Sequence, residues 1–489
     1  MLFNSISFLI FFPTVFILYW SLPQHARRWL LLGASCYFYM AFVPQYILIL
    51  FFLITVDYFL GRAIERSETH KRAYFILSIF SNVGVLFVFK YFNFFNENIA
   101  ALAHFLHWNY SLETLSLILP IGLSFHIFQS LAYIIEVYKG RYPAEKNYLV
   151  YALYVMFFPQ LVAGPIERPA HLLPQLHAPH TFDYARAISG LRLMLWGLFK
   201  KIAIANPLAV LVDHVYGSAT TDASIVFVAV VAFSIQLYAD FSGYSDIAVG
   251  TARMLGIDLQ QNFNQPYFSR STAELWRRWH ISLSTWFRDY VYYPLLWKKK
   301  DWGTRWVYVC IIITFMLTGL WHGAGWSFVI MGLLFGSYIV LGLVTKKARE
   351  AFVQWSGLCA WPKTHHILQS LTVFGLASIA NIFFRLQDTS RALEVLRTLV
   401  FGWGHGAFSF LFCNDYCASY IIGIGRKSLL SAGLSFFLLL AVDYVVYNKL
   451  TPPSIFSRRS VRWICYYIFI IWFLIAGYFA PETFIYFQF

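Results

Sequence analysis

Charged residues are scarce in this chain of 489 residues. Asp, Glu, Lys and Arg make up 12% of it, whereas a soluble globular domain carries about 25%. So few ionised side chains do not cover the surface of a soluble protein. Intrinsic disorder is excluded as well, because disordered chains are poor in aromatic residues and 20% of this chain is Phe, Trp or Tyr. The class that remains is a membrane protein.

Several catalytic signatures are also missing from the sequence. It contains no P-loop, no G-x-G-x-x-G and no G-x-S-x-G, so nucleotide hydrolysis, dinucleotide chemistry and the usual hydrolase nucleophile lose their signals. No cysteine or histidine set has the spacing of zinc ligands, and we expect neither a metal nor a resident cofactor. The cysteines are expected to be buried free thiols; they are Cys36, Cys310, Cys359, Cys413, Cys417 and Cys465.

Long apolar runs dominate the chain instead. A helix needs about 20 residues to cross a bilayer, and continuous runs favour helices over a transmembrane barrel. We therefore predict an all-α polytopic membrane protein with about 11–13 membrane segments, some short enough to be tilted or re-entrant. No internal repeat or low-complexity linker separates the runs, so a single domain over residues 1–489 is expected.

The net charge of +14 has two interpretations. Lys and Arg gather in the cytoplasmic loops of membrane proteins, which accounts for an excess of this kind. The second interpretation is that part of this positive charge belongs to a site for an anionic substrate or for anionic lipid head groups. Nucleic-acid binding is not expected, because the basic residues occupy short loops between apolar runs and form no single soluble face.

The stretch from 165 to 300 holds most of the polar groups that interrupt the apolar runs. The Gly164–Pro169 segment cannot form an uninterrupted helix. Asp240 and Asp246 follow within an apolar run, where ionisable groups are costly and usually line a cavity or pair with one another. They are candidates for binding a substrate or orienting a histidine, and equally for hydrogen bonds between helices. We expect a water-accessible depression in this region.

His322 lies between two apolar runs, in the segment Thr318–Trp326. A histidine there needs a partner or a task. Small neighbours such as Gly319 and Gly323 admit either another backbone or a ligand, and Trp321 is placed to line that approach. Two interpretations stay open: a functional histidine, and a buried neutral histidine that hydrogen-bonds across helices.

His280 lies in the segment Glu274–Asp289, which has helical character with interleaved charges and tryptophans. An uninterrupted helix would place Trp276, His280 and Ser284 on one face. Such a face, flanked by Arg277 and Arg278, suits an anionic ligand. The alternative is an interfacial amphipathic helix whose arginines meet lipid phosphates.

Five motifs, taken in order, resemble the membrane-bound O-acyltransferase family, in particular its bacterial alginate O-acetylase branch. They are Pro120–Tyr133, Phe158–Ile166, Tyr238–Asp246, Glu274–Trp286 and Gly319–Ala324, and the ending Phe484–Phe489 is similar as well. The resemblance spans nearly the whole chain. Departures are Gly325, where the branch commonly has Asn, and His126 and Gln129, where relatives commonly have Tyr and Glu.

The resemblance implies a multi-helix fold in which a funnel opens on each side of a thin partition. It assigns the family's key histidine to His322 and a second, supporting position to His280, which would orient the donor or polarise its carbonyl. Acetyl-CoA or another acyl-CoA would be the donor substrate, with Arg277 and Arg278 as candidates for its phosphates. The acceptor would be an extracytoplasmic cell-surface polysaccharide or a partner acetyltransferase. The location implied is the bacterial inner membrane, with the lipid bilayer as surroundings.

The mechanism and the acceptor have open alternatives. His322 would serve as the general base that takes the hydroxyl proton, or would itself be acylated as a nucleophile. Beside an acetyl-CoA-dependent O-acyltransferase, the remaining functions are a passive acyl conduit that serves a separate acetyltransferase, a transporter, and D-alanyl transfer to teichoic acid. A transporter usually shows two related halves, which this sequence lacks.

Overall fold

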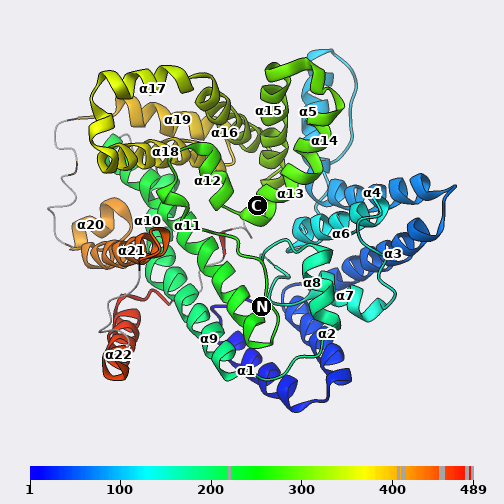
Figure 1. The fold of residues 1–489 in the computed structure, drawn as a ribbon. Coiled ribbons are helices and arrows are strands. Elements are labelled where there is room, and N and C mark those ends of the chain that lie inside the picture. The colour runs from blue at the N-terminus through cyan, green and yellow to red at the C-terminus, as the bar shows by residue number, and fades with distance from the viewer. Residues whose placement is uncertain are drawn as a thin grey trace. The chain divides into compact units, whose positions relative to one another are not determined.

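A computed structural model describes residues 1–162, 164–218, 222–404, 408, 415–450, 458–479 and 484–485. Every regular element within these ranges is a helix, which confirms the predicted all-α class (Figure 1). Cys413 and most of the ending Phe484–Phe489 lie outside the described residues. The chain divides into two compact units. Unit 1 comprises Met1–Leu195 and Ser245–Gln261, and unit 2 comprises Trp196–Tyr244 and Asn262–Phe489. The single domain over 1–489 stays a prediction.

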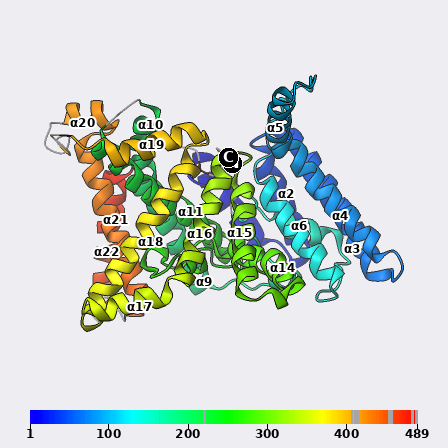
Figure 2. The ribbon, with the colours of Figure 1, turned by 90° about the horizontal axis from the view of Figure 1, so that it is seen from above.

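Unit 1 is built on a group of packed helices near the N-terminus, in which α3, α4 and α6 lie side by side (Figures 1 and 2). Its helices are α1 (Ile6–Ser21), α2 (Gln24–Met40), η1 (Pro44–Tyr46), α3 (Ile47–Arg66), α4 (Lys71–Leu86), η2 (Phe87–Tyr91), α5 (Phe92–Phe105), α6 (Leu123–Tyr138), α7 (Tyr148–Met156), α8 (Pro169–His177) and most of α9 (Tyr184–Phe199). The interval between α7 and α8 contains Gly164–Arg168, and α8 begins at Pro169, which confirms the predicted break there.

Unit 2 contains the remaining helices, among which α15 and α16 form a closely packed hairpin and α18 packs against α16 (Figure 2). They are η3 (Lys200–Ala205), α10 (Asn206–Gly217), α11 (Ala223–Met254, whose last turns belong to unit 1), η4 (Pro266–Phe268), α12 (Thr272–Arg278), α13 (Ile281–Phe287), η5 (Arg288–Tyr292), α14 (Tyr293–Lys298), η6 (Lys300–Trp302), α15 (Gly303–His322), α16 (Trp326–Val344), α17 (Lys346–Trp355), η7 (Leu358–Ala360), α18 (Pro362–Arg385), α19 (Thr389–Phe401), α20 (Asp415–Ile422), α21 (Arg426–Tyr447) and α22 (Arg459–Ala476).

In the described part of the chain, 9 helical stretches are long and apolar enough to cross a membrane. They are Pro44–Arg66, Lys71–Phe105, Tyr184–Gly217, Ala223–Met254, Gly303–His322, Trp326–Val344, Pro362–Arg385, Arg426–Tyr447 and Arg459–Ala476. The protein is therefore a multi-pass membrane protein. The number is below the segments predicted from apolar runs, because a run such as that of α1 forms a helix of only 16 residues. Re-entrant helices stay a prediction.

The cysteines differ in exposure. Cys36, Cys310, Cys359 and Cys465 are free thiols. Cys310 is buried, as predicted, whereas the prediction is wrong for Cys359, which is exposed in the connection between α17 and α18. The side chains of Cys413 and Cys417 lie outside the described part of the chain.

Glycines let α15 and α16 approach backbone to backbone. A Cβ atom on Gly319 would lie 2.1 Å from the carbonyl oxygen of Phe328, and one on Gly332 would lie 2.2 Å from that of Phe315. Both contacts are far shorter than any real Cβ contact, so only glycine fits. Of the two possibilities that the sequence left open for Gly319, the close approach of another backbone is the one observed. Small residues have this role at many helix interfaces in membranes.

Gly319→Ala is expected to destabilise the protein by about 1–3 kcal/mol, because the added methyl group forces the hairpin apart. Thermal unfolding of the purified protein in detergent measures the effect. Gly342→Ala on α16 is the matched control, since its Cβ would meet nothing within 4 Å. Equal melting temperatures for the two variants would contradict the close packing of α15 against α16.

Candidate active site

His322 is the last residue of α15, and its side chain is buried, with 6% of the residue exposed. The helix ends there because Gly323 adopts an extended conformation with φ of −164°. The short connection Gly323–Gly325 then leads into α16. His322 is thus held at the tip of the α15–α16 hairpin, which the glycine contacts described above fix in place.

The His322 side chain lines a small cavity within unit 2. The volume of this cavity is about 30 Å³. The lining residues come from α11, η4, α12, the turn after α12, α15, α16 and α18: Leu237, Tyr267, Leu275, Trp276, Trp279, His322, Met331, Phe335, Ala377, Asn381 and Phe384. Most of them are apolar or aromatic. Electrostatic interactions and hydrogen bonds are stronger in such surroundings than in water.

The uninterrupted helix predicted through His280 is wrong. α12 ends at Arg278, and His280 has φ of +43°, in the left-handed region, before α13 begins at Ile281. A residue other than glycine rarely takes this conformation unless its surroundings enforce it. The break removes the common face predicted for Trp276, His280 and Ser284. The hydroxyl of Ser284 donates to the carbonyl of Trp279, at 3.1 Å, and so stabilises the turn itself.

Asn262 is the residue that holds this turn in place. Its side-chain oxygen accepts hydrogen bonds from the amide and the hydroxyl of Ser282, at 3.3 and 3.0 Å, and lies 3.1 Å from Nδ1 of His280. Its backbone carbonyl accepts from the amide of Ile281, at 2.9 Å. Sequence reasoning missed Asn262, because it lies in a polar stretch, residues 258–265, and its burial is evident only from the structure. It acts as a positioning residue for His280.

These contacts define the protonation of His280. The side-chain oxygen of Asn262 has no hydrogen to donate, so its contact with Nδ1 of His280 is a hydrogen bond in which Nδ1 is the donor. Nδ1 therefore carries the proton, and Nε2 carries the lone pair. His280 lies outside the spanning helices and is completely buried. Burial, together with the neighbouring His322, holds the pKa of His280 well below its usual value. His280 is therefore a neutral imidazole near pH 7.

Trp321 lies between the two histidines. Its ring centroid is 6.0 Å from that of His280 and 5.0 Å from that of His322. His322 also packs edge to face against Phe384 of α18, with the ring centroids 5.3 Å apart. Of the predicted site residues, His322 and Trp276 line the cavity. Trp321 and His280 do not line it, but Trp321 packs against both histidines.

The two arginines have different surroundings. Arg278 forms an ion pair with Glu274, at 2.9 Å, donates to the carbonyl of Asn264, at 3.1 Å, and lies over the ring of Tyr447. Its guanidinium is therefore engaged in holding α12. Arg277 is exposed and makes no polar contact with the described residues. Of the two, Arg277 is the one available to a ligand phosphate, and the role of both in donor binding stays a prediction.

Asp240 is buried and forms an ion pair with Lys201 of η3, at 2.7 Å. Its second oxygen accepts from the backbone amide of Ile485, at 2.9 Å. Asp240 is not among the residues that line the cavity, and these contacts favour the structural interpretation. Asp246, six residues further along α11, is half-buried and belongs to unit 1. Substrate binding by either aspartate stays a prediction.

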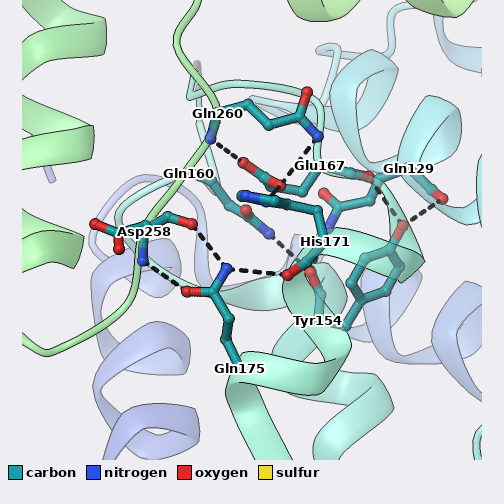
Figure 3. Close-up of polar contacts among 8 residues, drawn as sticks. All are labelled: Gln129, Tyr154, Gln160, Glu167, His171, Gln175, Asp258 and Gln260. Atoms are coloured by element: carbon teal, nitrogen blue, oxygen red, sulfur yellow. Dashed lines mark hydrogen bonds and ion pairs between the residues drawn. The ribbon is translucent and has the colours of Figure 1, made fainter.

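A second polar cluster lies in unit 1 (Figure 3). The Glu167 carboxylate is fully buried, lies 2.6 Å from Nδ1 of His171 and accepts from the backbone amide of Gln260, also at 2.6 Å. Gln175 and the backbone of Asp258 exchange two further hydrogen bonds, at 2.9 and 2.8 Å. Burial raises the pKa of Glu167, and the Glu167 carboxylate raises the pKa of His171. The cluster fastens segment 258–260, which precedes Asn262, to α8.

His126 and Gln129, which depart from the family pattern, both lie buried on α6 in unit 1. Gln129 donates to the carbonyl of Tyr154, and Gln160 donates to the same carbonyl, at 2.7 Å. His126 bonds to the backbone of Val155. Tyr154 and Val155 are in the last turn of α7, where carbonyl groups have no partner within the helix. These side chains therefore cap α7.

Comparison with known proteins gives matches over most of the chain. The model of the membrane-bound O-acyltransferase family matches residues 145–386, a range that contains His280, Asn262 and every residue lining the cavity. A probable alginate O-acetylase of Azotobacter vinelandii is 35% identical over 419 residues, which are 84% of this chain and 80% of that protein.

Two other relatives differ in the polymer that their names give. A peptidoglycan O-acetyltransferase of Helicobacter pylori is 34% identical over 436 residues, covering 82% of this chain and 80% of that protein. A teichoic acid D-alanyltransferase of Bacillus subtilis is 30% identical over 234 residues, covering 45% of this chain and 57% of that protein. Both O-acetyl-transferring relatives therefore match a larger share of the chain than the D-alanyltransferase does.

Proposed function

This chain belongs to the membrane-bound O-acyltransferase family, and on that premise we propose that it transfers an acetyl group from acetyl-CoA towards the hydroxyl groups of a cell-surface polysaccharide. The observation that carries the proposal is the position of His322. It is a buried histidine at the tip of a rigid hairpin, and it lines a narrow, mostly apolar cavity.

The chemistry follows from that position. The acceptor hydroxyl oxygen attacks the carbonyl carbon of the thioester, a C–O bond forms, and the C–S bond breaks. His322 takes the hydroxyl proton and returns it to the departing thiolate, so that it leaves the reaction unchanged. An imidazole has a pKa of about 6.5, which suits both steps near neutral pH.

The size of the cavity supports a short acyl group. A single water molecule needs about 10–15 Å³ of such space, and the cavity offers about 30 Å³. An acetyl group, with three heavy atoms beyond the sulfur, is of that scale. The choice of acetyl as the acyl group rests also on the relatives that are named for O-acetyl transfer.

The proposed donor site rests on the position of charged residues, and the proposed acceptor rests on the names of the relatives. Arg277 is exposed and able to form paired hydrogen bonds with a CoA phosphate, and loops rich in Lys and Arg are typical of the cytoplasmic face. Two relatives are named for alginate and for peptidoglycan, and both of these polymers carry sugar hydroxyls. We therefore assign the acceptor to an extracytoplasmic polysaccharide, reached directly or through a partner acetyltransferase, and the protein to a bacterial inner membrane.

The test is transfer by the purified protein in proteoliposomes. Radiolabelled acetyl-CoA is added on one side, and alginate or peptidoglycan fragments are supplied as acceptors. The expected result is consumption of acetyl-CoA and an alkali-labile ester on the sugar. Consumption without sugar modification would indicate the conduit form, in which a partner completes the transfer. Lack of any acetyl-CoA turnover, with D-alanyl thioesters accepted instead, would contradict acetyl transfer.

A further inference from the structure

Thioester chemistry requires hydrogen-bond donors that stabilise the negative charge that develops on the carbonyl oxygen. Five residues with hydrogen-bonding side chains line the His322 cavity: Tyr267, Trp279, Trp276, Asn381 and His322 itself. The hydroxyl of Tyr267 is engaged, because it donates to the carbonyl of Ser234. His280, which packs against Trp321, carries its proton on Nδ1 and donates it to Asn262, so its Nε2 has no proton to donate. The donors must come from the other residues.

Trp276 supplies a held indole N–H. Its Nε1 is buried and has no hydrogen-bond partner among the described residues. An orphaned donor of this kind destabilises the empty protein, so it demands an explanation. The ring is fixed edge to face between Phe315 of α15 and Phe335 of α16, with centroids at 5.1 and 5.0 Å. The donor therefore needs little reorganisation to meet an acceptor.

Asn381 supplies an amide from α18, and only 8% of it is exposed. Its Nδ2 makes one long contact of 3.4 Å to the hydroxyl of Ser234, which in turn donates to Ser378 at 2.9 Å. An amide nitrogen has two N–H donors, so a second one remains for a ligand in the cavity. Because its hydrogen bond to Ser378 fixes the Ser234 hydroxyl, the contact with Ser234 restricts the orientation of the Asn381 amide.

We propose that the indole N–H of Trp276 and the amide of Asn381 form the oxyanion hole of this enzyme, binding the carbonyl oxygen of the acyl thioester. The inference rests on the proposed function, and it names the donors to the carbonyl oxygen that the proposed function leaves unspecified. As the C–O bond forms and before the C–S bond breaks, negative charge gathers on the carbonyl oxygen. Fixed donors in apolar surroundings stabilise that charge more than they stabilise the ground-state carbonyl.

The first experiment compares Trp276→Phe and Asn381→Leu with the wild type in the acetyl-transfer assay. Trp276→Phe keeps an aromatic ring, Asn381→Leu keeps a side chain of similar shape, and each variant removes the donor. The expected result is a fall in kcat of about 10²–10³-fold for each variant, with KM for acetyl-CoA changed by less than about threefold. Trp286→Phe, which alters a buried tryptophan outside the cavity, is the matched control and is expected to keep wild-type kcat. Trp279→Phe tests the remaining indole of the cavity.

The second experiment observes the carbonyl directly. In a His322→Ala background, bound 13C-labelled acetyl thioester is followed by isotope-edited infrared spectroscopy. Its carbonyl stretch is expected at low frequency and to move upward when Trp276→Phe or Asn381→Leu is added. This readout does not depend on turnover, and a merely structural role would not produce it.

The outcomes separate the two hypotheses. If the wild type transfers acetyl and both variants keep kcat within about threefold, or if only Trp279→Phe lowers kcat, the oxyanion hole is overturned and the proposed function stands. An unshifted carbonyl band in both double variants overturns it as well. If the wild type shows no thioester turnover, the proposed function itself fails.

Discussion

Replacing His322 by alanine is expected to lower acetyl transfer by about 10³-fold or more, because a general base contributes roughly 10²–10⁴-fold to the rate. The side chain lines the cavity, and in the proposed function it is the group that takes the acceptor proton. Initial rates of labelled ester formation in proteoliposomes measure the effect. Because the substitution removes only part of one side chain from the hairpin tip, binding of acetyl-CoA is expected to persist.

His104→Ala is the matched control for this experiment. His104 is an exposed histidine in the last turn of α5, and its loss should leave the rate unchanged. Thermal unfolding of both variants shows whether the fold is intact. A well-folded His322→Ala protein with normal transfer would refute the assignment of His322 and require another catalytic group.

The same variant separates the two mechanisms of His322. If His322 is the nucleophile, wild-type protein incubated with labelled acetyl-CoA and no acceptor retains the label covalently, and His322→Ala does not. If His322 is the general base, neither protein retains label, although the wild type turns over when the acceptor is added. The general base is the expected result, because one proton transfer suffices for attack by a hydroxyl group.

Asp240→Asn is expected to destabilise the fold by about 3–5 kcal/mol, because it leaves the ammonium of Lys201 buried without its counter-charge. The pair is 2.7 Å apart, and both side chains are almost inaccessible, at 7% and 2% exposure. Asp240 also holds the amide of Ile485, so the loss reaches the C-terminal segment. Unfolding of the purified protein in detergent, by heat and by denaturant, measures the change.

Two further variants test whether the ion pair is the cause. Lys201→Met combined with Asp240→Leu removes both charges and is expected to recover most of the stability, since uncharged residues can replace a buried pair at little cost. Glu350→Gln breaks an exposed pair with Lys346, and it should change stability by less than about 1 kcal/mol. If Asp240→Asn unfolds like the wild type but loses transfer, the substrate-binding role predicted from the sequence is the correct one.

The arrangement of α12 and α13 illustrates what local sequence cannot predict. Glu274–Asp289 has the periodicity of one helix, yet the chain breaks at His280 in a left-handed conformation. The cause is Asn262, which lies 18 residues upstream and accepts hydrogen bonds from the turn. Helix propensity is a weak preference that tertiary contacts override. The Ser284 and Arg278 side chains consequently serve the local structure and do not share a face with His280.

Asn381 and Lys201 illustrate the second kind of gap. Both lie within apolar runs, and neither matches a motif with a known spacing. Asn381 becomes part of the site only because α18 packs against α16. Lys201 becomes the counter-charge of Asp240 only because η3 lies near α11 within unit 2. Pairings between residues distant in the chain depend on which helix faces meet, and a single sequence does not specify those.

Composition and motifs by themselves determined the class of this protein and singled out His322 as the candidate histidine. A chain with so few charges can only bury its surface in lipid, and a histidine between two apolar runs requires a reason to be there. Tertiary structure alone decided which polar groups accompany His322, because that depends on close packing. The glycines of α15 and α16 bring two backbones together, Asn262 turns His280 out of its helix, and α18 adds Asn381. The last two contacts join segments that a local sequence pattern does not connect, and all three are stabilised only once the helices have assembled.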